Sequence, residues 1–346
     1  MSNKSFVFHP VVFFIVIVLL SSCGNRNRTE NKSITGKDSI VQILRDLDSK
    51  IADHPSDAGL YQQRTKYYLI DRQYEKALSD ISKAISLDPQ KAAYYITLSD
   101  VYLGMGKPDN ANTALLKAIN LDPRSNAALI RLAKLSLIMK DYKGTFDYVK
   151  KALMVEPLNP QVYFTRALAF LEKGDTNAAV QDLKKTVDLD QKFYDAFVEL
   201  GELYALRKDP VAIDYLKDAI RLRPQSTEAL YNLGMVYQES GHYMEALNTY
   251  DALAKTDSTF KDAYFNQGYI YLVYLTDYPK AIQFFSVALQ RDPGYVEALF
   301  NRGYAYELSG SYTKAARDYK HVIELRSNYP KAIDGLNRID RLKGRN

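Results

Sequence analysis

The chain has 346 residues, of which 47% are hydrophobic and 25% are charged, and its formal net charge at pH 7 is +5. Lysine and arginine are interspersed with acidic residues, and this near balance argues against nucleic-acid binding. The single cysteine and the four histidines are scattered, with no pair at metal-ligand spacing. The composition therefore predicts no metal site and no cofactor.

Residues 1–22 have the pattern of an export signal. Lys4 precedes the apolar run VVFFIVIVLL, from Val11 to Leu20. Ten residues of helix rise about 15 Å, half of the roughly 30 Å hydrocarbon core, so the run is too short to span a bilayer. A positive start, a short apolar region and the small residues Ser21 and Ser22 are typical of a signal peptide.

Cys23 follows this signal directly. The run Leu20-Ser21-Ser22-Cys23 resembles the bacterial lipobox, which implies that Cys23 carries diacylglycerol and becomes the mature N-terminus. A lone exported cysteine has no disulfide partner within its chain, whereas two or three acyl chains hold a protein firmly in a membrane. An ordinary signal peptide with an unmodified thiol is the alternative. Gly24 stands where an inner-membrane retention signal often has Asp, so likeness to Gram-negative lipoproteins favours the periplasmic face of the outer membrane.

The segment after the cysteine is polar. Residues 24–37, GNRNRTENKSITGK, include Ile34 as their one large apolar residue. A segment of this composition buries too little apolar surface to offset the entropy lost on ordering. We therefore expect residues 23–37 to form a flexible tether. Residues 38–57 then show helical spacing of apolar side chains and predict an N-terminal capping helix or half-repeat. Its apolar stripe comprises Ile40, Leu44, Leu47 and Ile51.

From residue 58 the sequence repeats every 34 or 35 residues. The clearest copies are ALYNLGMVY (229–237), AYFNQGYIY (263–271) and ALFNRGYAY (298–306). Each unit has a small residue, usually a larger side chain three positions later, and a second small position about twelve further on. This pattern resembles the tetratricopeptide repeat (TPR), a unit of two antiparallel helices. The first small positions are Thr65, Ser99, Ala133, Ala167, Gly201, Gly234, Gly268 and Gly303.

The resemblance implies an all-α, right-handed solenoid of helical hairpins, a TPR superhelix. We expect about eight repeats over residues 58–328 and a C-terminal capping helix at 329–346. Glycine is expected where a first helix ends in the left-handed region. Gly106, Gly174, Gly241 and Gly310 stand at such places, while the turn near Pro210 is one residue short and YLTDYPK (274–280) carries one extra.

The first helices of the last three repeats carry a candidate binding groove. In ALYNLGMVY the core stripe takes Leu230, Leu233, Gly234 and Tyr237, and a rotation of about 100° per residue puts the remaining side chains opposite. In the TPR family this opposite face lines the inner groove, where aromatic surface and asparagines suit an extended peptide. The alternative is that these aromatics only pack between neighbouring helices. The candidate groove residues are Tyr231, Asn232, Met235, Phe265, Asn266, Tyr269, Phe300, Asn301 and Tyr304.

Charge around the candidate groove indicates the kind of ligand. Glu228, Asp262 and Glu297 recur one turn before the asparagines, which favours a neutral or basic segment. No Lys or Arg accompanies the asparagines on the required face of the helix, so the carboxylate clamp of chaperone-type TPRs is not matched. Residues 58–193 carry 20 basic and 15 acidic residues, and residues 194–325 carry 13 and 18. The acidic half therefore contains the candidate groove.

These patterns predict a non-catalytic scaffold or adaptor lipoprotein that binds protein partners in the bacterial envelope. The chain resembles envelope TPR lipoproteins that recruit peptidoglycan-remodelling enzymes. Some assemble outer-membrane, secretion or pilus machines instead, so an assembly factor is the alternative. Glycan capture is disfavoured because the chain has no long insertion between repeats and no Trp for stacking. No nucleophile stands with a base, so an enzyme is not predicted.

Overall fold

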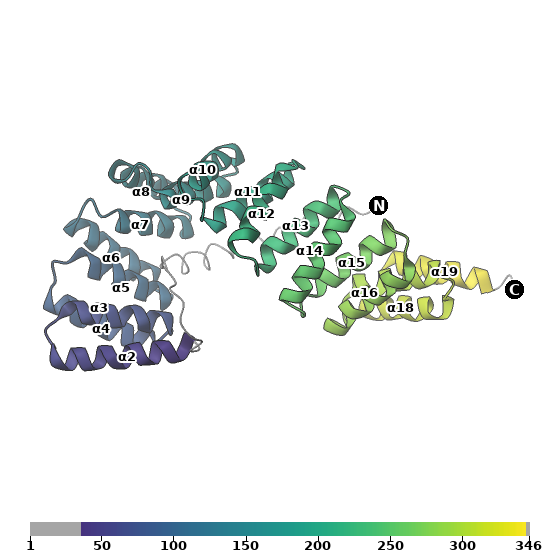
Figure 1. Ribbon diagram of the computed structural model, residues 1–346, viewed down its shortest axis with the longest axis horizontal. Helices are drawn as coiled ribbons and strands as arrows, with labels where there is room; N and C mark the ends of the chain where they lie inside the picture. Colours follow the sequence, from purple (N-terminus) through teal and green to yellow (C-terminus); the bar gives the residue numbers. More distant parts are fainter. Residues whose placement is uncertain (1–35, 344–346) are drawn as a thin grey trace. The chain divides into compact units, whose positions relative to one another are not determined.

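The computed structural model describes residues 36–343, and within them the chain is all-α. Eight helical hairpins follow one another, preceded by α2 and followed by α19 (Figure 1). This confirms the predicted fold of eight repeats between two capping helices. The expected signal, Cys23 and most of the expected tether lie outside the described residues. Contacts between residues divide the chain after Leu189 into two compact units, here called unit 1 and unit 2.

Unit 1 contains the first capping helix and repeats one to four. Its helices are α2 (Gly36–Asp53), α3 (Ala58–Ile70), α4 (Tyr74–Leu87), α5 (Ala92–Gly104), α6 (Pro108–Leu121), α7 (Asn126–Ile138), α8 (Tyr142–Val155), α9 (Pro160–Glu172) and α10 (Thr176–Leu189). The odd-numbered helices from α3 to α17 are the first helices of the eight repeats, and the even-numbered helices from α4 to α18 are the second.

Unit 2 contains repeats five to eight and the last capping helix. Its helices are α11 (Tyr194–Leu206), α12 (Val211–Leu222), α13 (Thr227–Glu239), α14 (Tyr243–Thr256), α15 (Lys261–Val273), α16 (Tyr278–Arg291), α17 (Val296–Leu308), α18 (Tyr312–Leu325) and α19 (Pro330–Lys343). Within each unit every hairpin packs against the next one along the chain (Figure 1).

The small positions let the two helices of a hairpin approach closely, as interdigitated side chains require. All eight small residues are buried. In unit 2 they are glycines, each facing a large side chain of the second helix. A Cβ atom built on Gly234 would lie 2.5 Å from Cε1 of Tyr250, which is closer than real Cβ contacts come. A larger residue at Gly234 would therefore force the ring of Tyr250 to shift.

Each hairpin turns through one residue with positive φ. Gly106, Gly174, Gly241 and Gly310 have φ between 70° and 81°, as expected for glycine at the end of a helix. The other four turns place a residue with a side chain in the same region, at φ between 52° and 58°. Two of these occur where the sequence departs from the common turn length. The four residues are Arg72, Lys140, Lys208 and Thr276.

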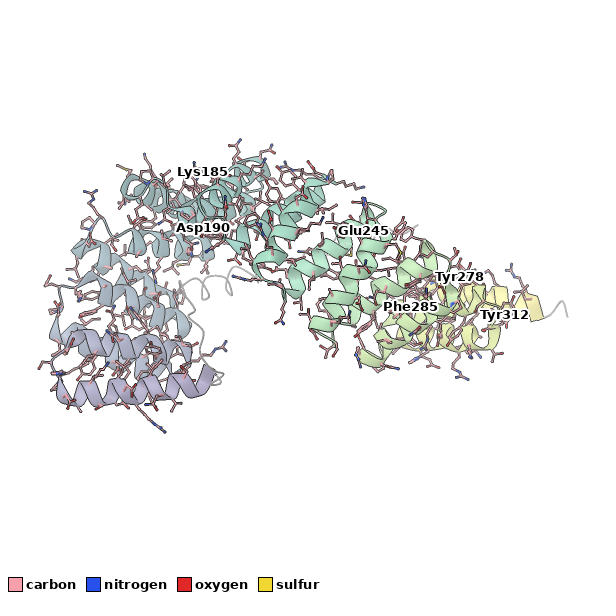
Figure 2. All side chains as sticks on the ribbon, viewed as in Figure 1. Lys185, Asp190, Glu245, Tyr278, Phe285 and Tyr312 are labelled. Carbon is pink, nitrogen blue, oxygen red and sulfur yellow. The ribbon has the colours of Figure 1, made fainter. Side chains whose placement is uncertain are left out.

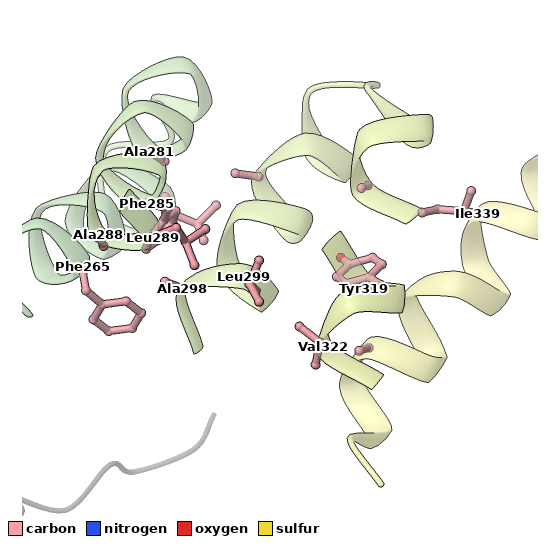
Figure 3. Packing of buried hydrophobic residues seen from close by; sticks show 14 residues of the cluster. Phe265, Ala281, Phe285, Ala288, Leu289, Ala298, Leu299, Tyr319, Val322 and Ile339 are labelled. Carbon is pink, nitrogen blue, oxygen red and sulfur yellow. The ribbon is translucent and has the colours of Figure 1, made fainter. Parts of the chain in front are cut away.

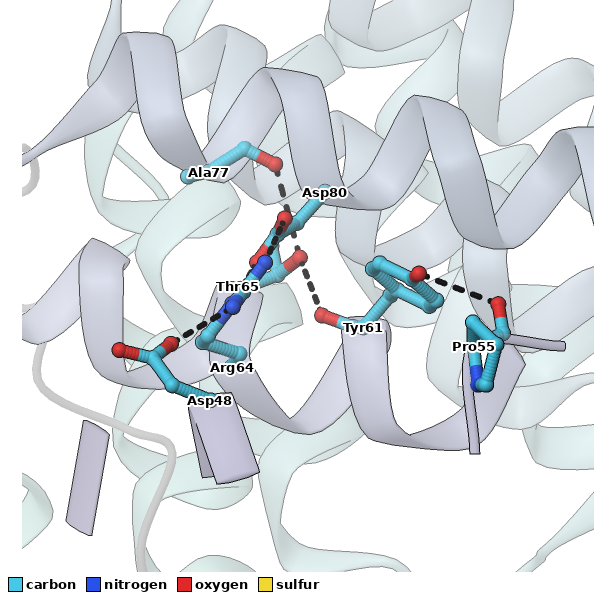
Figure 4. A network of polar contacts seen from close by, with 7 residues as sticks. All are labelled: Asp48, Pro55, Tyr61, Arg64, Thr65, Ala77 and Asp80. Carbon is cyan, nitrogen blue, oxygen red and sulfur yellow. Dashed lines mark hydrogen bonds and ion pairs between the residues drawn. The ribbon is translucent and has the colours of Figure 1, made fainter. Parts of the chain in front are cut away.

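Ion pairs join the two helices of repeats one, four and eight. In the first repeat, Nε of Arg64 donates to Asp80 at 2.6 Å and one Nη donates to Asp48 of α2 at 2.6 Å (Figure 4). Arg166 pairs with Asp182, and Arg302 with Asp318, at the same separation of 16 residues. All three partner aspartates in the second helices are buried. Bidentate pairs of this kind fix the orientation of the helices as well as neutralising the carboxylate.

The core of the last repeats is aromatic. Phe285 of α16 and Tyr319 of α18 are fully buried, and Ile339 of α19 closes the end of the cluster (Figure 3). Tyr312, at the start of α18, lies at the surface (Figure 2). The last capping helix therefore covers apolar surface that the final hairpin leaves exposed, as a repeat array requires.

Candidate functional site

The candidate residues lie on one side of the first helices of unit 2. The predicted core stripe of α13, from Leu230 to Tyr237, is buried. Neighbouring first helices contact each other, as α11 does α13 and α15 does α17. The side of α11, α13, α15 and α17 that bears the candidate positions is here called the first-helix face. Of the nine candidates, Phe265 and Asn266 are buried and the other seven are half-buried.

In repeat six the three candidate side chains contact the helices on either side. Tyr231 lies against Phe260, with ring centroids 5.6 Å apart. Asn232 donates from Nδ2 to Oε1 of Glu202 on α11 at 2.6 Å. Met235 accepts through Sδ a hydrogen bond of 3.5 Å from Asn266 on α15. This part of the face is therefore continuous across three repeats.

In repeat seven the aromatic candidates differ in burial. Phe265 is 8% exposed and lies 5.7 Å from the ring of Phe285 and 5.1 Å from that of Tyr295. It packs between neighbouring helices, in agreement with the packing alternative. Tyr269 stacks on Phe265 with ring centroids 6.3 Å apart and meets Tyr274 edge-on at 6.1 Å. Tyr269 remains half-buried and able to contact a ligand.

Repeat eight has the same arrangement. Phe300 lies 5.7 Å from Tyr319 and 5.3 Å from Tyr329, so it covers the core. Tyr304 stacks on Phe300 at 6.3 Å with nearly parallel rings. Asn301 donates to the backbone oxygen of Glu297 in its own helix at 2.7 Å. Each of the three candidate asparagines thus already makes a hydrogen bond within the chain.

Two of the acidic residues one turn earlier accept hydrogen bonds from tyrosine hydroxyls. Glu228 accepts from the hydroxyl of Tyr194 at 3.4 Å. Asp262 accepts from the hydroxyl of Tyr295 at 2.6 Å. Burial raises the pKa of Glu228 to about 7, with the charge of Glu202 as the next cause. Glu228 and Asp262 are therefore both hydrogen-bonded within the chain, and burial favours the protonated form of Glu228.

The structure adds two glutamates that the sequence argument missed. Glu199 and Glu202 of α11 occupy the positions held by an asparagine and by Met235, Tyr269 or Tyr304 in the next three repeats. Burial raises the pKa of Glu199 to about 8, and the charges of Glu202, Glu228 and Asp195 add to the shift. The repeat register, extended back to Gly201, contains the signal that would have identified both.

Among residues 36–343, no three or more His, Cys, Asp and Glu side chains are grouped to hold a metal ion. No helix in this range combines the length and apolar character that a membrane span requires.

Sequence comparison identifies the repeats. Residues 164–227, 231–296 and 270–330 match a family model described as tetratricopeptide repeat, and residues 92–125 match a second model with that description. Together the matches cover more than half of the chain.

Three individual proteins illustrate the likeness. The chain is 28% identical to human Superkiller complex protein 3 over 142 residues. This aligned stretch covers 37% of this chain and 9% of that protein. It is 29% identical to the Hsp70-Hsp90 organizing protein of Triticum aestivum over 152 residues. This second aligned stretch covers 44% of this chain and 25% of that protein. The chain therefore spans a quarter or less of these relatives. The structure of Pseudomonas aeruginosa pilF matches 64% of this chain and 97% of its own at 21% identity, with a TM-score of 0.51, and so has a similar fold.

Proposed function

Because the chain belongs to the tetratricopeptide repeat family, we propose that it is a non-catalytic scaffold that binds an extended protein segment on the first-helix face of unit 2. Proteins of this family typically serve as protein-interaction scaffolds. The name of the wheat relative describes a protein that organizes two others, Hsp70 and Hsp90. A repeated helical face is suited to this task because a stretched segment contacts successive repeats in turn.

One observation carries the proposal: the half-buried tyrosines at equivalent places in successive repeats. Tyr269 and Tyr304 each stack on a phenylalanine that covers the core, so each ring is held in place while it remains half-buried. Tyrosine held in this way gives a large contact area at little entropic cost, which is why it recurs at binding hot spots.

The test is the double substitution Tyr269→Ser and Tyr304→Ser. A partner crosslinked to the wild-type protein in intact cells is identified first, and its affinity for each variant is then measured. Removing two hot-spot aromatics should weaken binding by about 2 kcal/mol or more, roughly thirtyfold. Tyr312→Ser removes an exposed tyrosine from a second helix, and this control should bind as the wild type does.

Helicity and melting temperature distinguish binding from packing. We expect both to change little in the double variant because the two phenylalanines beneath the tyrosines remain. Unchanged capture would contradict the groove proposal. Collapse of the fold would show that the tyrosines belong to the core, and would equally overturn it.

We further propose that the scaffold is a lipoprotein anchored through Cys23 on the periplasmic face of the outer membrane. The proposal is supported by the charged start, the short apolar run and the Leu20-Ser21-Ser22-Cys23 sequence. Two or three acyl chains on Cys23 would hold the protein in the membrane, whereas a single acyl chain anchors a protein only weakly.

Cys23→Ser tests the anchor. The variant should appear in the soluble envelope fraction or persist as an uncleaved precursor, which fractionation and mass spectrometry distinguish. A normally processed variant that stays in the membrane fraction would show that the lipobox interpretation is wrong.

A further inference from the structure

A hollow in unit 1 lies between the second helix of repeat three and the first helix of repeat four. It has a volume of about 460 Å³ and is lined by side chains of α8 and α9, and it is here called the α8–α9 hollow. This volume lies within the range of about 300–1,000 Å³ that is typical of ligand sites. Most of the lining side chains are apolar, namely Phe146, Val149, Leu153, Met154 and Phe170.

The hollow lies where repeat four lacks a leucine of the common core. The residue directly before the first small position is leucine in repeats two, three, five and six. In repeat three this residue is Leu132, which is fully buried in a cluster with Leu115 and Ala118 of the preceding second helix, α6. In repeat four it is Arg166, whose guanidinium donates to Asp182 of α10 at 2.6 and 2.7 Å. Because this bidentate pair fixes the arginine on the other helix of its own hairpin, the space beside α8 is not filled as a leucine would fill it.

Apolar surface at the hollow is accessible. Met154 is 75% exposed, and the rings of Phe146 and Phe170 are half-buried with centroids 5.1 Å apart. Met154 stands nine positions after the second small residue of its repeat, where the other seven repeats have a polar or charged residue. A methionine at a position that otherwise faces water indicates an apolar partner, to which its flexible side chain adapts. The seven equivalents are Ser86, Asn120, Asp188, Arg221, Lys255, Gln290 and Glu324.

The charged side chains at the hollow are basic. Lys150 and Arg166 line it, and no acidic residue does. Lys173, near the end of α9, lies over the ring of Phe146 with Nζ 5.7 Å from the centroid. Asp182 offsets the charge of Arg166, but within residues 36–343 neither Lys150 nor Lys173 belongs to an ion pair. The hollow therefore presents two uncompensated cations beside an apolar floor.

Charge complementarity selects an acidic partner segment with an apolar side chain. Residues 24–37 of this chain do not fit, because they contain four basic residues and one acidic residue. We propose that the α8–α9 hollow binds a Leu or Phe side chain of a protein partner, and that a neighbouring Asp or Glu of that partner pairs with Lys150 or Lys173. This site goes beyond the binding proposed for unit 2, and it requires a partner of opposite charge.

Three short fluorescent peptides test the inference by anisotropy with the full chain. The first contains Asp-Leu-Phe-Glu between Ala and Ser residues, the second has Asn-Leu-Phe-Gln instead, and the third has Asp-Ser-Ser-Glu. The first peptide should bind about fivefold more tightly than the second, as expected for exposed charge pairs. The third peptide should bind least, because it has no apolar side chain for the hollow.

Matched variants locate the binding. Lys150→Gln should remove the preference for the acidic peptide, whereas Lys151→Gln, on the same helix but outside the lining of the hollow, should retain it. Met154→Ser should weaken binding of the first peptide about fivefold. Met244→Ser, at a 60% exposed position in unit 2, should bind as the wild type does. Since Lys150 and Met154 are both exposed, these variants should fold normally, which circular dichroism verifies.

Several outcomes would overturn the inference. They include no binding of any peptide, equal binding of the acidic and amide peptides, or an unchanged preference in Lys150→Gln. Loss of binding in the double variant Tyr269→Ser and Tyr304→Ser would place the peptide on the first-helix face instead. Laurate that displaces the first peptide at a lower concentration than the unlabelled peptide would make a lipid the occupant, and a dimer that Met154→Ser dissociates would make it a second copy of this chain.

Discussion

Glu199 should make unit 2 less stable as the pH rises, and Glu199→Gln should remove this effect. In the unfolded chain the carboxyl ionises near its ordinary pKa of 4.5, whereas in the folded protein burial and neighbouring carboxylates raise the pKa to about 8. Between these values the folded state binds the additional proton. The free energy of unfolding therefore falls as pH rises through this window, and the loss is complete above the folded-state pKa.

The size of the effect follows from the shift. A difference of 3.5 units, from 4.5 to about 8, corresponds to an upper limit of about 5 kcal/mol. The side chain retains some exposure and titrates together with Glu202 and Glu228, so solvent screening and coupling reduce this limit. We expect Glu199→Gln to stabilise the protein by about 2 kcal/mol near pH 9 and by almost nothing near pH 5.

Urea denaturation followed by circular dichroism at several pH values measures the difference. Hydrogen exchange at one pH then shows whether the protection gained lies in α11 and α13, as expected when each repeat contacts mainly its neighbours. Glu324→Gln, an exposed substitution in the same unit, should show no such pH dependence. Parallel stability curves for the wild type and Glu199→Gln would refute the reasoning, as would destabilisation of the variant at high pH.

Two further substitutions test the packing of unit 2. Gly234→Leu should lower the free energy of unfolding by about 1–3 kcal/mol or more, because the Cβ alone would meet the buried ring of Tyr250 at 2.5 Å. Hydrogen exchange should locate the loss of protection in repeats five to seven. Uniform loosening of both units would contradict this prediction. Arg302→Ala should cost about 3 kcal/mol in a denaturation experiment, because it leaves the carboxylate of Asp318 buried at 4% exposure without its ion pair. Lys255→Ala breaks an exposed pair instead and should change stability by less than about 1 kcal/mol; equal losses in these two variants would contradict the argument.

The repeat architecture was determined by local features of the sequence. Three local features carried the prediction: a period of 34 or 35 residues, a small residue in each first helix, and glycine at four turns. Each of these features depends on only a few neighbouring residues, so each indicates one structure. The prediction of paired helices between two caps was therefore confirmed. The four turns without glycine could not be predicted in this way. Lys140 and Thr276, for example, have positive φ, which their residue types do not predict.

Tertiary structure decided which side chains of the first-helix face are available. Phe265 and Tyr269 lie one helical turn apart in the same pattern, yet Phe265 is enclosed by Phe285 of α16 and by Tyr295, which precedes α17. Asn232 is held by a glutamate 30 residues earlier. A helical period assigns a residue to a face, but the neighbouring repeats determine what covers it.

The raised pKa of two glutamates on that face has the same origin. Glu199 and Glu202 are ordinary glutamates in the sequence. Burial raises the pKa of both, and the charges of Glu202 and of Glu228 on α13 add to the shift of Glu199. Burial of a charge depends on atoms that are distant in the chain, so the periodicity of the sequence cannot predict its energetic cost. The sequence alone determined the repeats and their core stripe, whereas the site within them was decided by packing between adjacent hairpins.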